Sequence, residues 1–129
     1  RRRTPRELSE RISYRTGDML SARWGRFSYV FAMDSLIHYA APDIAGALDS
    51  FAKRTDEKII FTVAPKTTLL SAMHLTGKLF PRSDRSPAIV PVREAKLARA
   101  LSELNRPSPK SLGRESRGFY ISHALELCP

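Results

Sequence analysis

The sequence has only one cysteine, Cys128, which stands next to the last residue. One chain can therefore form neither an internal disulfide nor a site in which several thiolates hold a metal ion, and no metal site is predicted. No apolar run approaches the roughly 18 residues of a membrane-spanning helix. The residues after Arg1–Arg3 are polar and do not form the apolar core of a signal peptide. We therefore expect a soluble, cytoplasmic chain without a transmembrane segment.

Glycine is also scarce, with six residues in 129. None of them belongs to a G-x-G-x-x-G or Walker motif, the loops that cradle phosphates or a nucleoside after the first strand of many α/β sheets. A doubly wound domain that begins at this point lacks its first half. We expect the nucleoside contacts made by such a loop to be missing from this chain.

Acidic residues are few, because 13 Asp and Glu face 22 Lys and Arg and leave a net charge of +9. Such an excess favours anionic partners, such as nucleic acid, an acidic membrane surface or a carboxylate-bearing small molecule. No aromatic residues interleave the basic ones as in RNA-binding platforms, and we expect no nucleic-acid partner. A solvated basic surface is the simplest explanation for any one of these charges, including Arg1–Arg3.

Two strands with a helix between them form the best-defined part of the pattern. The apolar run 27–33 ends at Asp34 and is typical of a strand covered on both faces by helices. Pro42 and Asp43 begin a helix with one apolar face, and 58–63 forms a second buried strand. The apolar face of the helix consists of Ile44, Ala47, Leu48, Phe51 and Ala52. This order predicts a right-handed parallel crossover.

The remaining elements are predicted from shorter patterns. A helix begins at Thr67 or Thr68 and runs to Phe80, and a proline-punctuated loop covers 80–92. A second helix contains Leu97, Leu101 and Leu104 and ends before Pro107. The last strand covers 119–127, with 114–117 as the stump of its hairpin partner, and a short strand covers 12–14. The fold class is α/β, and a ligand is expected beyond the carboxyl ends of the strands.

Three stretches carry a resemblance to a known family: 33–39 (MDSLIHY), 61–67 (FTVAPKT) and 77–81 (GKLFP). Residues 82–92 and 118–127 match it in the same order. Together they resemble the magnesium-protoporphyrin IX O-methyltransferases over 17–127. The resemblance implies one partial domain, 1–129, that is the C-terminal portion of a Rossmann-like class I methyltransferase with a mostly parallel sheet and an antiparallel last strand. The glycine-rich half that binds the cofactor is absent.

The function that the resemblance implies is methyl transfer in (bacterio)chlorophyll biosynthesis. The methyl donor is S-adenosyl-L-methionine, and the acceptor is a propionate of magnesium-protoporphyrin IX. A protein partner in the tetrapyrrole pathway and peripheral association with a photosynthetic membrane are also implied. Because the glycine loop is missing, we expect the chain alone to lack autonomous activity. A non-catalytic basic module that binds the porphyrin or an acidic partner is the alternative.

Three residues after the first strand are the catalytic candidates. A propionate, whose carboxyl group ordinarily has a pKa of about 4, is already ionised at neutral pH, so the site must mainly align oxygen, methyl carbon and sulfur and exclude water. His38 is expected to hold or deprotonate the carboxyl group. Asp34 stands at a strand end, and Tyr39 stacks on the macrocycle or donates to it. The alternatives are a structural histidine, a capping aspartate and a packed tyrosine.

The cofactor candidates are Asp18, Met19 and Met33. The resemblance implies that the carboxylate of Asp18 accepts a hydrogen bond from the amino group of the adenine and that Met19 packs on the adenine ring. It places Met33 with them as a cofactor-binding residue. A plain Asx turn at Asp18 is the alternative.

The substrate candidates are mostly cations, because the two propionates of the porphyrin need positive partners. They are Lys66, Lys78, Arg82, Arg85 and Tyr120. Each cation alone is equally well explained as a solvated surface charge. His74 is a weak candidate for an axial ligand of the magnesium, and His123 on the last strand is expected to be structural.

Overall fold

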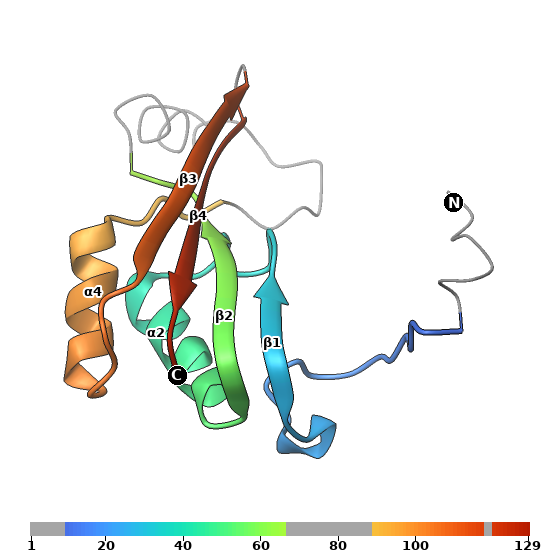
Figure 1. Ribbon diagram of the computed structural model, residues 1–129. Helices are drawn as coiled ribbons and strands as arrows, with labels where there is room; N and C mark the ends of the chain where they lie inside the picture. The colour runs from blue at the N-terminus through green and yellow to red at the C-terminus, as the bar shows by residue number, and fades with distance from the viewer. Residues whose placement is uncertain (1–9, 67–88, 118–119) are drawn as a thin grey trace, which may run out of the picture.

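A computed structural model of the chain describes residues 10–66, 89–117 and 120–129. Four strands form one mixed sheet in the order β1-β2-β4-β3, and two helices lie side by side on one face of it (Figure 1). The strands are β1 (Phe27–Ala32), β2 (Thr55–Val63), β3 (Lys110–Arg117) and β4 (Tyr120–Leu127), and the helices are α2 (Ala41–Ala52) and α4 (Glu94–Glu103). A 3₁₀ turn, η1 (Ala22–Trp24), precedes β1. None of the helices in the described ranges is long and apolar enough to cross a membrane.

The predicted parallel crossover is confirmed. β1 and β2 pair in parallel, and α2 connects them. The helix begins at Ala41, and all five residues of its predicted apolar face are buried. β2 begins at Thr55, three residues earlier than predicted, because pairing with β1 extends it into polar sequence that carries no strand signal.

The antiparallel end of the sheet is longer than the sequence indicated. β4 pairs with both β2 and β3, so the predicted last strand is confirmed for the described residues 120–127. The expected stump at 114–117 is the second half of the eight-residue strand β3, all of whose residues are exposed. A polar, exposed strand shows no apolar alternation, and its backbone pairing with β4 holds it in place.

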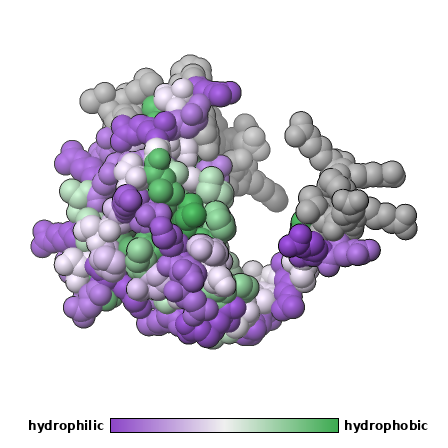
Figure 2. Space-filling view, viewed as in Figure 1, coloured by the Kyte–Doolittle hydropathy of each residue, from purple (hydrophilic) through white to green (hydrophobic). Residues whose placement is uncertain are grey.

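Only one face of the sheet is covered by the described helices, which corrects the expectation of a strand covered on both faces. The paired row Ala32, Phe61 and Leu125 is buried and belongs to the core. The next row along the strands faces the other way, and Phe31 in that row is 65% exposed. Phe27 and Tyr29 of β1 are exposed as well. Apolar side chains consequently gather in the middle of the face turned to the viewer in Figure 2.

Two smaller expectations can also be compared with the structure. The strand predicted at 12–14 is wrong, since these residues form no strand in the described part of the chain. Leu97 and Leu101 are fully buried as predicted, whereas Leu104 follows the end of α4 and is 41% exposed. The helix expected from Thr67 to Phe80 lies outside the described residues.

An ion pair joins the two helical segments. Arg106, just after α4, donates from Nε to Asp49 of α2 at 2.9 Å, and both side chains are largely covered. Lys53 lies 2.7 Å from the same carboxylate. The hydrogen bond from Lys53 and the one from Arg106 hold the pKa of Asp49 below its usual range, although burial opposes them. The carboxylate therefore stabilises the fold in its charged form.

Replacing the carboxylate of Asp49 makes the free energy of unfolding of the chain less dependent on pH in the acidic range. We expect Asp49→Asn to lower the free energy of unfolding by about 1 kcal/mol at neutral pH, because Arg106 loses its charged partner. The contribution of Asp49 is fully present above the unfolded pKa of about 3.9 and disappears as the pH falls through the lower folded pKa. Urea unfolding at pH 7 and below pH 4 measures both effects. Equal destabilisation at the two pH values would contradict this account.

Candidate functional site

The carboxyl ends of β1 and β2 meet at one edge of the sheet, as parallel neighbours must. Asp34 follows β1 with a positive φ of 51°, a conformation that aspartate adopts more readily than most residues. Its amide donates to the hydroxyl of Thr62 at 2.8 Å, and that hydroxyl donates to Asp34 Oδ1 at 3.2 Å. Thr62 is 2% exposed. A buried threonine of β2 thus fixes the turn that carries the catalytic candidates.

A third segment crosses both strand ends. The Val90 amide donates to the carbonyl of Ile37 at 2.8 Å, and the Val92 amide donates to the carbonyl of Ala64 at 2.8 Å. The amide of Lys66 in turn donates to the carbonyl of Val92 at 3.0 Å. Val92 is buried, and it forms an isolated parallel bridge with Pro65. Backbone hydrogen bonds therefore bring 33–39, 61–66 and 89–92, which are separate in sequence, to one edge of the sheet.

The catalytic candidates lie together on the short turn after β1. Leu36, fully buried, anchors the turn, and the Tyr39 amide donates to its carbonyl at 3.2 Å. His38 is half-buried, whereas Tyr39 and Met33 are 46% and 56% exposed. A half-buried imidazole beside exposed residues is accessible to a ligand and still held in place. The turn has the placement that a site beyond a strand end requires.

The cofactor candidates Asp18 and Met19 belong to a tight turn before η1. Asp18 accepts from the Leu20 amide at Oδ1 (2.9 Å), so the Asx turn considered from the sequence is present. Its carbonyl also accepts from the indole of Trp24 at 2.7 Å. Arg54 donates to the carbonyls of Met19 and Ser21 and ties this turn to the body of the fold. The turn is thus fixed beside the first strand.

A cavity of about 620 Å³ lies between this turn and β1. Met19 and Trp24 line it together with Phe27, Tyr29 and Phe31, so part of its wall is aromatic. Asp18 is one residue away from the lining, and Met33 is not among the lining residues. A flat apolar ring suits such walls.

Only two of the substrate candidates fall in the described part of the chain. Lys66 is exposed and lines a groove between the start of α2 and α4. Tyr120 begins β4 opposite Arg117, and only its backbone is described. Lys78, Arg82 and Arg85, like His74, lie outside the described residues. The cation cluster proposed from the sequence is therefore represented here by Lys66.

His123 has the structural surroundings that the sequence suggested. Its ring is 4% exposed, and Nε2 lies 2.8 Å from the hydroxyl of Ser111. Nδ1 is 2.7 Å from a carboxylate oxygen of Glu94, within ion-pair distance but not aligned for a hydrogen bond. Glu94 begins α4, so the contact connects that helix to the sheet.

Sequence reasoning missed the residues that hold the turn. Thr62 stands in an apolar strand where a buried hydroxyl carries no pattern, and its link to Asp34 spans 28 positions. Val90 and Val92 were placed in a loop. Their alternation with Pro91 is the one local sign of the extended conformation that lets them cross the strand ends.

The architecture defines the class of protein first. A parallel β1–β2 pair beside an antiparallel β4–β3 pair, with helices on one face, is the C-terminal portion of a Rossmann-like class I methyltransferase sheet. The crystal structure of magnesium protoporphyrin IX methyltransferase from Synechocystis PCC 6803 with bound SAH superimposes with a TM-score of 0.61 at 27% identity, covering 81% of this chain and 46% of that one. The same enzyme with bound SAM gives a TM-score of 0.55 at 22% identity, covering 81% of this chain and 40% of that one.

Sequence relatives then define the family. The family model of the magnesium-protoporphyrin IX methyltransferase C-terminus matches residues 32–129, and the chain belongs to this family. The magnesium-protoporphyrin O-methyltransferase of Rhodobacter capsulatus is 49% identical over 98% of this chain and 55% of its own length. That of Synechocystis is 30% identical over 79% of this chain and 44% of its own length. The chain thus spans about half the length of these curated relatives.

Removing the hydroxyl of Thr62 tests how the turn is held. We expect Thr62→Val to lower the free energy of unfolding by about 1–2 kcal/mol, because the amide of Asp34 loses its acceptor. Thr62→Ser keeps the hydroxyl and is the matched control for the turn. Urea unfolding measures the stability, and amide hydrogen exchange of 33–39 should accelerate only in the valine variant. Unchanged exchange in that variant would show that Thr62 does not hold the turn.

Proposed function

We propose that this chain supplies the strand-end part of the active site of a SAM-dependent O-methyltransferase. The reaction transfers a methyl group to a propionate carboxylate of magnesium-protoporphyrin IX and gives the monomethyl ester, a step of (bacterio)chlorophyll biosynthesis. The observation that carries the proposal is the meeting of 33–39, 61–66 and 89–92 at one sheet edge. Each of these segments, which are separate in sequence, lies within a stretch that matches the family.

The chemistry requires positioning more than proton transfer. The propionate is ionised at neutral pH, so the reaction is an in-line displacement at the sulfonium methyl group. His38 orients the carboxylate or removes a residual proton from it. Asp34, fixed by Thr62, holds the geometry of the turn, and the exposed ring of Tyr39 packs against the macrocycle or donates to it.

The described residues fit the adenine end of S-adenosyl-L-methionine. The aromatic cavity beside Met19 accommodates a flat ring. Asp18 Oδ1 accepts a hydrogen bond from the Leu20 amide in the turn. Its Oδ2 has no hydrogen-bond donor among the described residues, and we propose that it accepts a hydrogen bond from the adenine amino group. Met33, 56% exposed after β1, is proposed to lie on the cofactor side of the turn. Contacts to the methionine and the ribose are assigned to the part of the relatives that this chain does not match.

The propionates need cationic partners, and we assign this role to Lys66, Lys78, Arg82 and Arg85, with Tyr120 at the border of the macrocycle. Lys66 is exposed immediately after the strand end that carries Thr62. The other three cations share the chain segment between Lys66 and Val90. A porphyrin edge bound over the strand ends would lie beside Lys66 and the turn.

A second function rests on the groove that Lys66 lines, since four cations line it and only Arg99 has an anionic partner among the described residues. If the chain binds magnesium-protoporphyrin without taking part in methyl transfer, it acts as a basic porphyrin-binding or acidic-partner-binding module. Binding that persists when no methyl transfer can be reconstituted would favour this second function.

Location and partners follow from charge. We propose peripheral association with an anionic photosynthetic membrane and contact with a protein of the tetrapyrrole pathway, both supported by the net charge of +9. Attraction of this kind weakens with ionic strength. Sedimentation with vesicles of phosphatidylglycerol should retain the chain at low salt and release it at high salt. Retention on the vesicles that does not change with salt concentration would contradict an electrostatic attraction.

The catalytic role of His38 is tested in a reconstituted enzyme. The chain is fused to the N-terminal part of the Rhodobacter capsulatus relative that it does not match. We expect this fusion to methylate magnesium-protoporphyrin IX and His38→Ala to lower kcat by about 100-fold, because the carboxylate loses its orienting group. Product formation is followed by chromatography.

Arg117→Ala is the control, since Arg117 is exposed on β3 and no role in the reaction is assigned to it. An unchanged rate in His38→Ala would remove His38 from the mechanism. A fusion that folds cooperatively, binds S-adenosyl-L-methionine and still transfers no methyl group would contradict the proposed function as a whole.

A further inference from the structure

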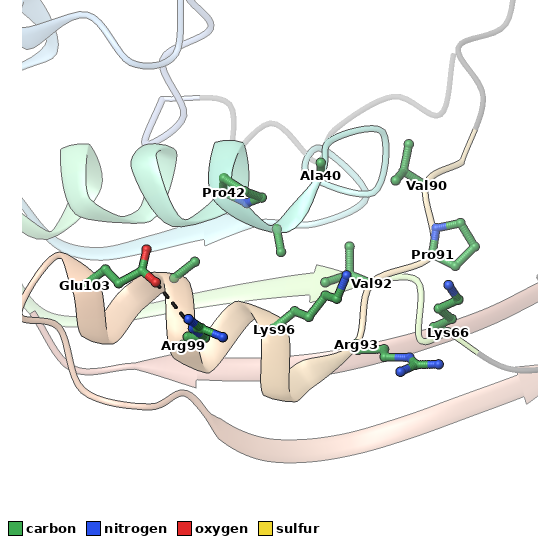
Figure 3. Close-up of a pocket in the computed structure, with 12 residues that line it drawn as sticks. Ala40, Pro42, Lys66, Val90, Pro91, Val92, Arg93, Lys96, Arg99 and Glu103 are labelled. Atoms are coloured by element: carbon green, nitrogen blue, oxygen red, sulfur yellow. Dashed lines mark ion pairs between the residues drawn. The ribbon is translucent and has the colours of Figure 1, made fainter.

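A groove lies between the beginning of α2 and the length of α4, on the helical side of the sheet. It has a volume of about 530 Å³, within the range of small-molecule sites. Small apolar residues of 40–42 and 90–92 form one wall, and long basic side chains of α4 form the other (Figure 3). The methyl-transfer site proposed above leaves these α4 side chains without a role.

Four cations line the groove: Lys66, Arg93, Lys96 and Arg99. The last three follow one another at intervals of three residues, which places them along one side of the helix. Figure 3 shows Lys96 extended along the groove toward Val92, with Lys66 and Arg93 together at the strand end of the groove. Lys96 is thus directed into the groove, and Lys66 and Arg93 line its strand end.

Little negative charge opposes these cations. Glu103 is the one acid that lines the groove among the described residues, and its carboxylate lies 3.4 Å from Arg99. Lys66, Arg93 and Lys96 have no anionic partner within the described ranges. Three uncompensated positive charges around one cavity repel one another, and a bound anion would relieve that repulsion.

The helix ends strengthen the same field. α2 begins at Ala41 and α4 at Glu94, and the residues before them, Ala40 and Arg93, make no side-chain cap. The first amides of a helix carry partial positive charge and bind anions when they are uncapped. The acids of the first turns, Asp43 and Glu94, are not among the lining residues, and Glu94 is directed toward Arg114 and His123.

We propose that this groove binds a phosphate-bearing ligand, whose phosphate or diphosphate lies among Lys66, Arg93 and Lys96 and whose apolar part lies against 40–42 and 90–91. A phosphate has more oxygens than a carboxylate, and each can accept from a separate cation, so a phosphate suits a groove lined by several cations better than a carboxylate does. The ligand is a free small molecule or the headgroup of a phospholipid, and the phosphate group is common to both.

The test is calorimetric titration of the purified chain with sodium pyrophosphate. We expect saturable binding that Lys96→Glu weakens at least about tenfold, because one charge-assisted contact is lost and a repulsive charge takes its place. Lys96→Gln removes the positive charge without adding a negative one, so its affinity for pyrophosphate should lie between those of the unchanged chain and of Lys96→Glu. Lys96 is exposed on α4, and circular dichroism confirms that each variant folds.

Arg117→Glu is the matched control, since it makes the same charge change at an exposed position of β3 outside the groove. Equal weakening in both glutamate variants would overturn the proposal, because net charge alone would then explain the binding. A parallel arm measures sedimentation with vesicles of phosphatidylglycerol. Loss of vesicle binding restricted to the Lys96 variants assigns the groove to a lipid headgroup, and absence of saturable binding to both probes refutes it.

Discussion

The backbone hydrogen bonds of Val90 and Val92 are the constraint on which the candidate site depends. They connect the carbonyls of Ile37 and Ala64 through one extended segment, and the amide of Lys66 completes the arrangement. Because Val92 and Ala64 are buried, the hydrogen bond between them is shielded from water and has to be satisfied within the protein. The turn after β1, the end of β2 and the start of α4 consequently keep one relative arrangement. The groove on the helical side and the turn at the strand ends both depend on it.

The two sides of the sheet differ in what they leave exposed. On the helical side, α2 and α4 bury the rows of Ile59, Phe61 and Val63, and the remaining cavity is basic. On the other side, β1 presents aromatic rings beside a largely apolar cavity. An apolar surface suits a flat ring, and a basic groove suits an anion. The fold thereby separates two kinds of binding surface by the thickness of one sheet.

Much of the fold follows from local sequence patterns, because burial leaves a periodic signature. The apolar face of α2, the apolar run of β1 and the buried core of β2 could all be predicted. β3 could be predicted only in part, since an exposed strand that depends on its neighbour has no alternation of its own. The strand expected at 12–14 is wrong, because apolar alternation over three residues is too short a pattern to specify a strand.

The candidate site was predictable where residues stand at strand ends and not where they act across the fold. Asp34 and His38 follow the apolar run of β1, and a strand end of this kind can be identified from sequence alone. The link from Thr62 to Asp34 and the convergence of Lys66 with Arg93 and Lys96 join residues far apart in the chain, and no local pattern encodes them. The proposed reaction came from the resemblance to the family, and the contacts that hold the candidate residues in place came from the tertiary structure.

The measurement that tests the central claim most directly is a titration of magnesium-protoporphyrin IX into the purified chain, followed by absorbance. It is repeated with the triple variant Lys78→Ala, Arg82→Ala, Arg85→Ala and with a control in which Arg11, Lys110 and Arg117 are replaced by alanine. If this chain carries the porphyrin side of the active site, saturable binding will be lost in the first variant and kept in the control. Equal binding by all three proteins, or none by any of them, would contradict the account.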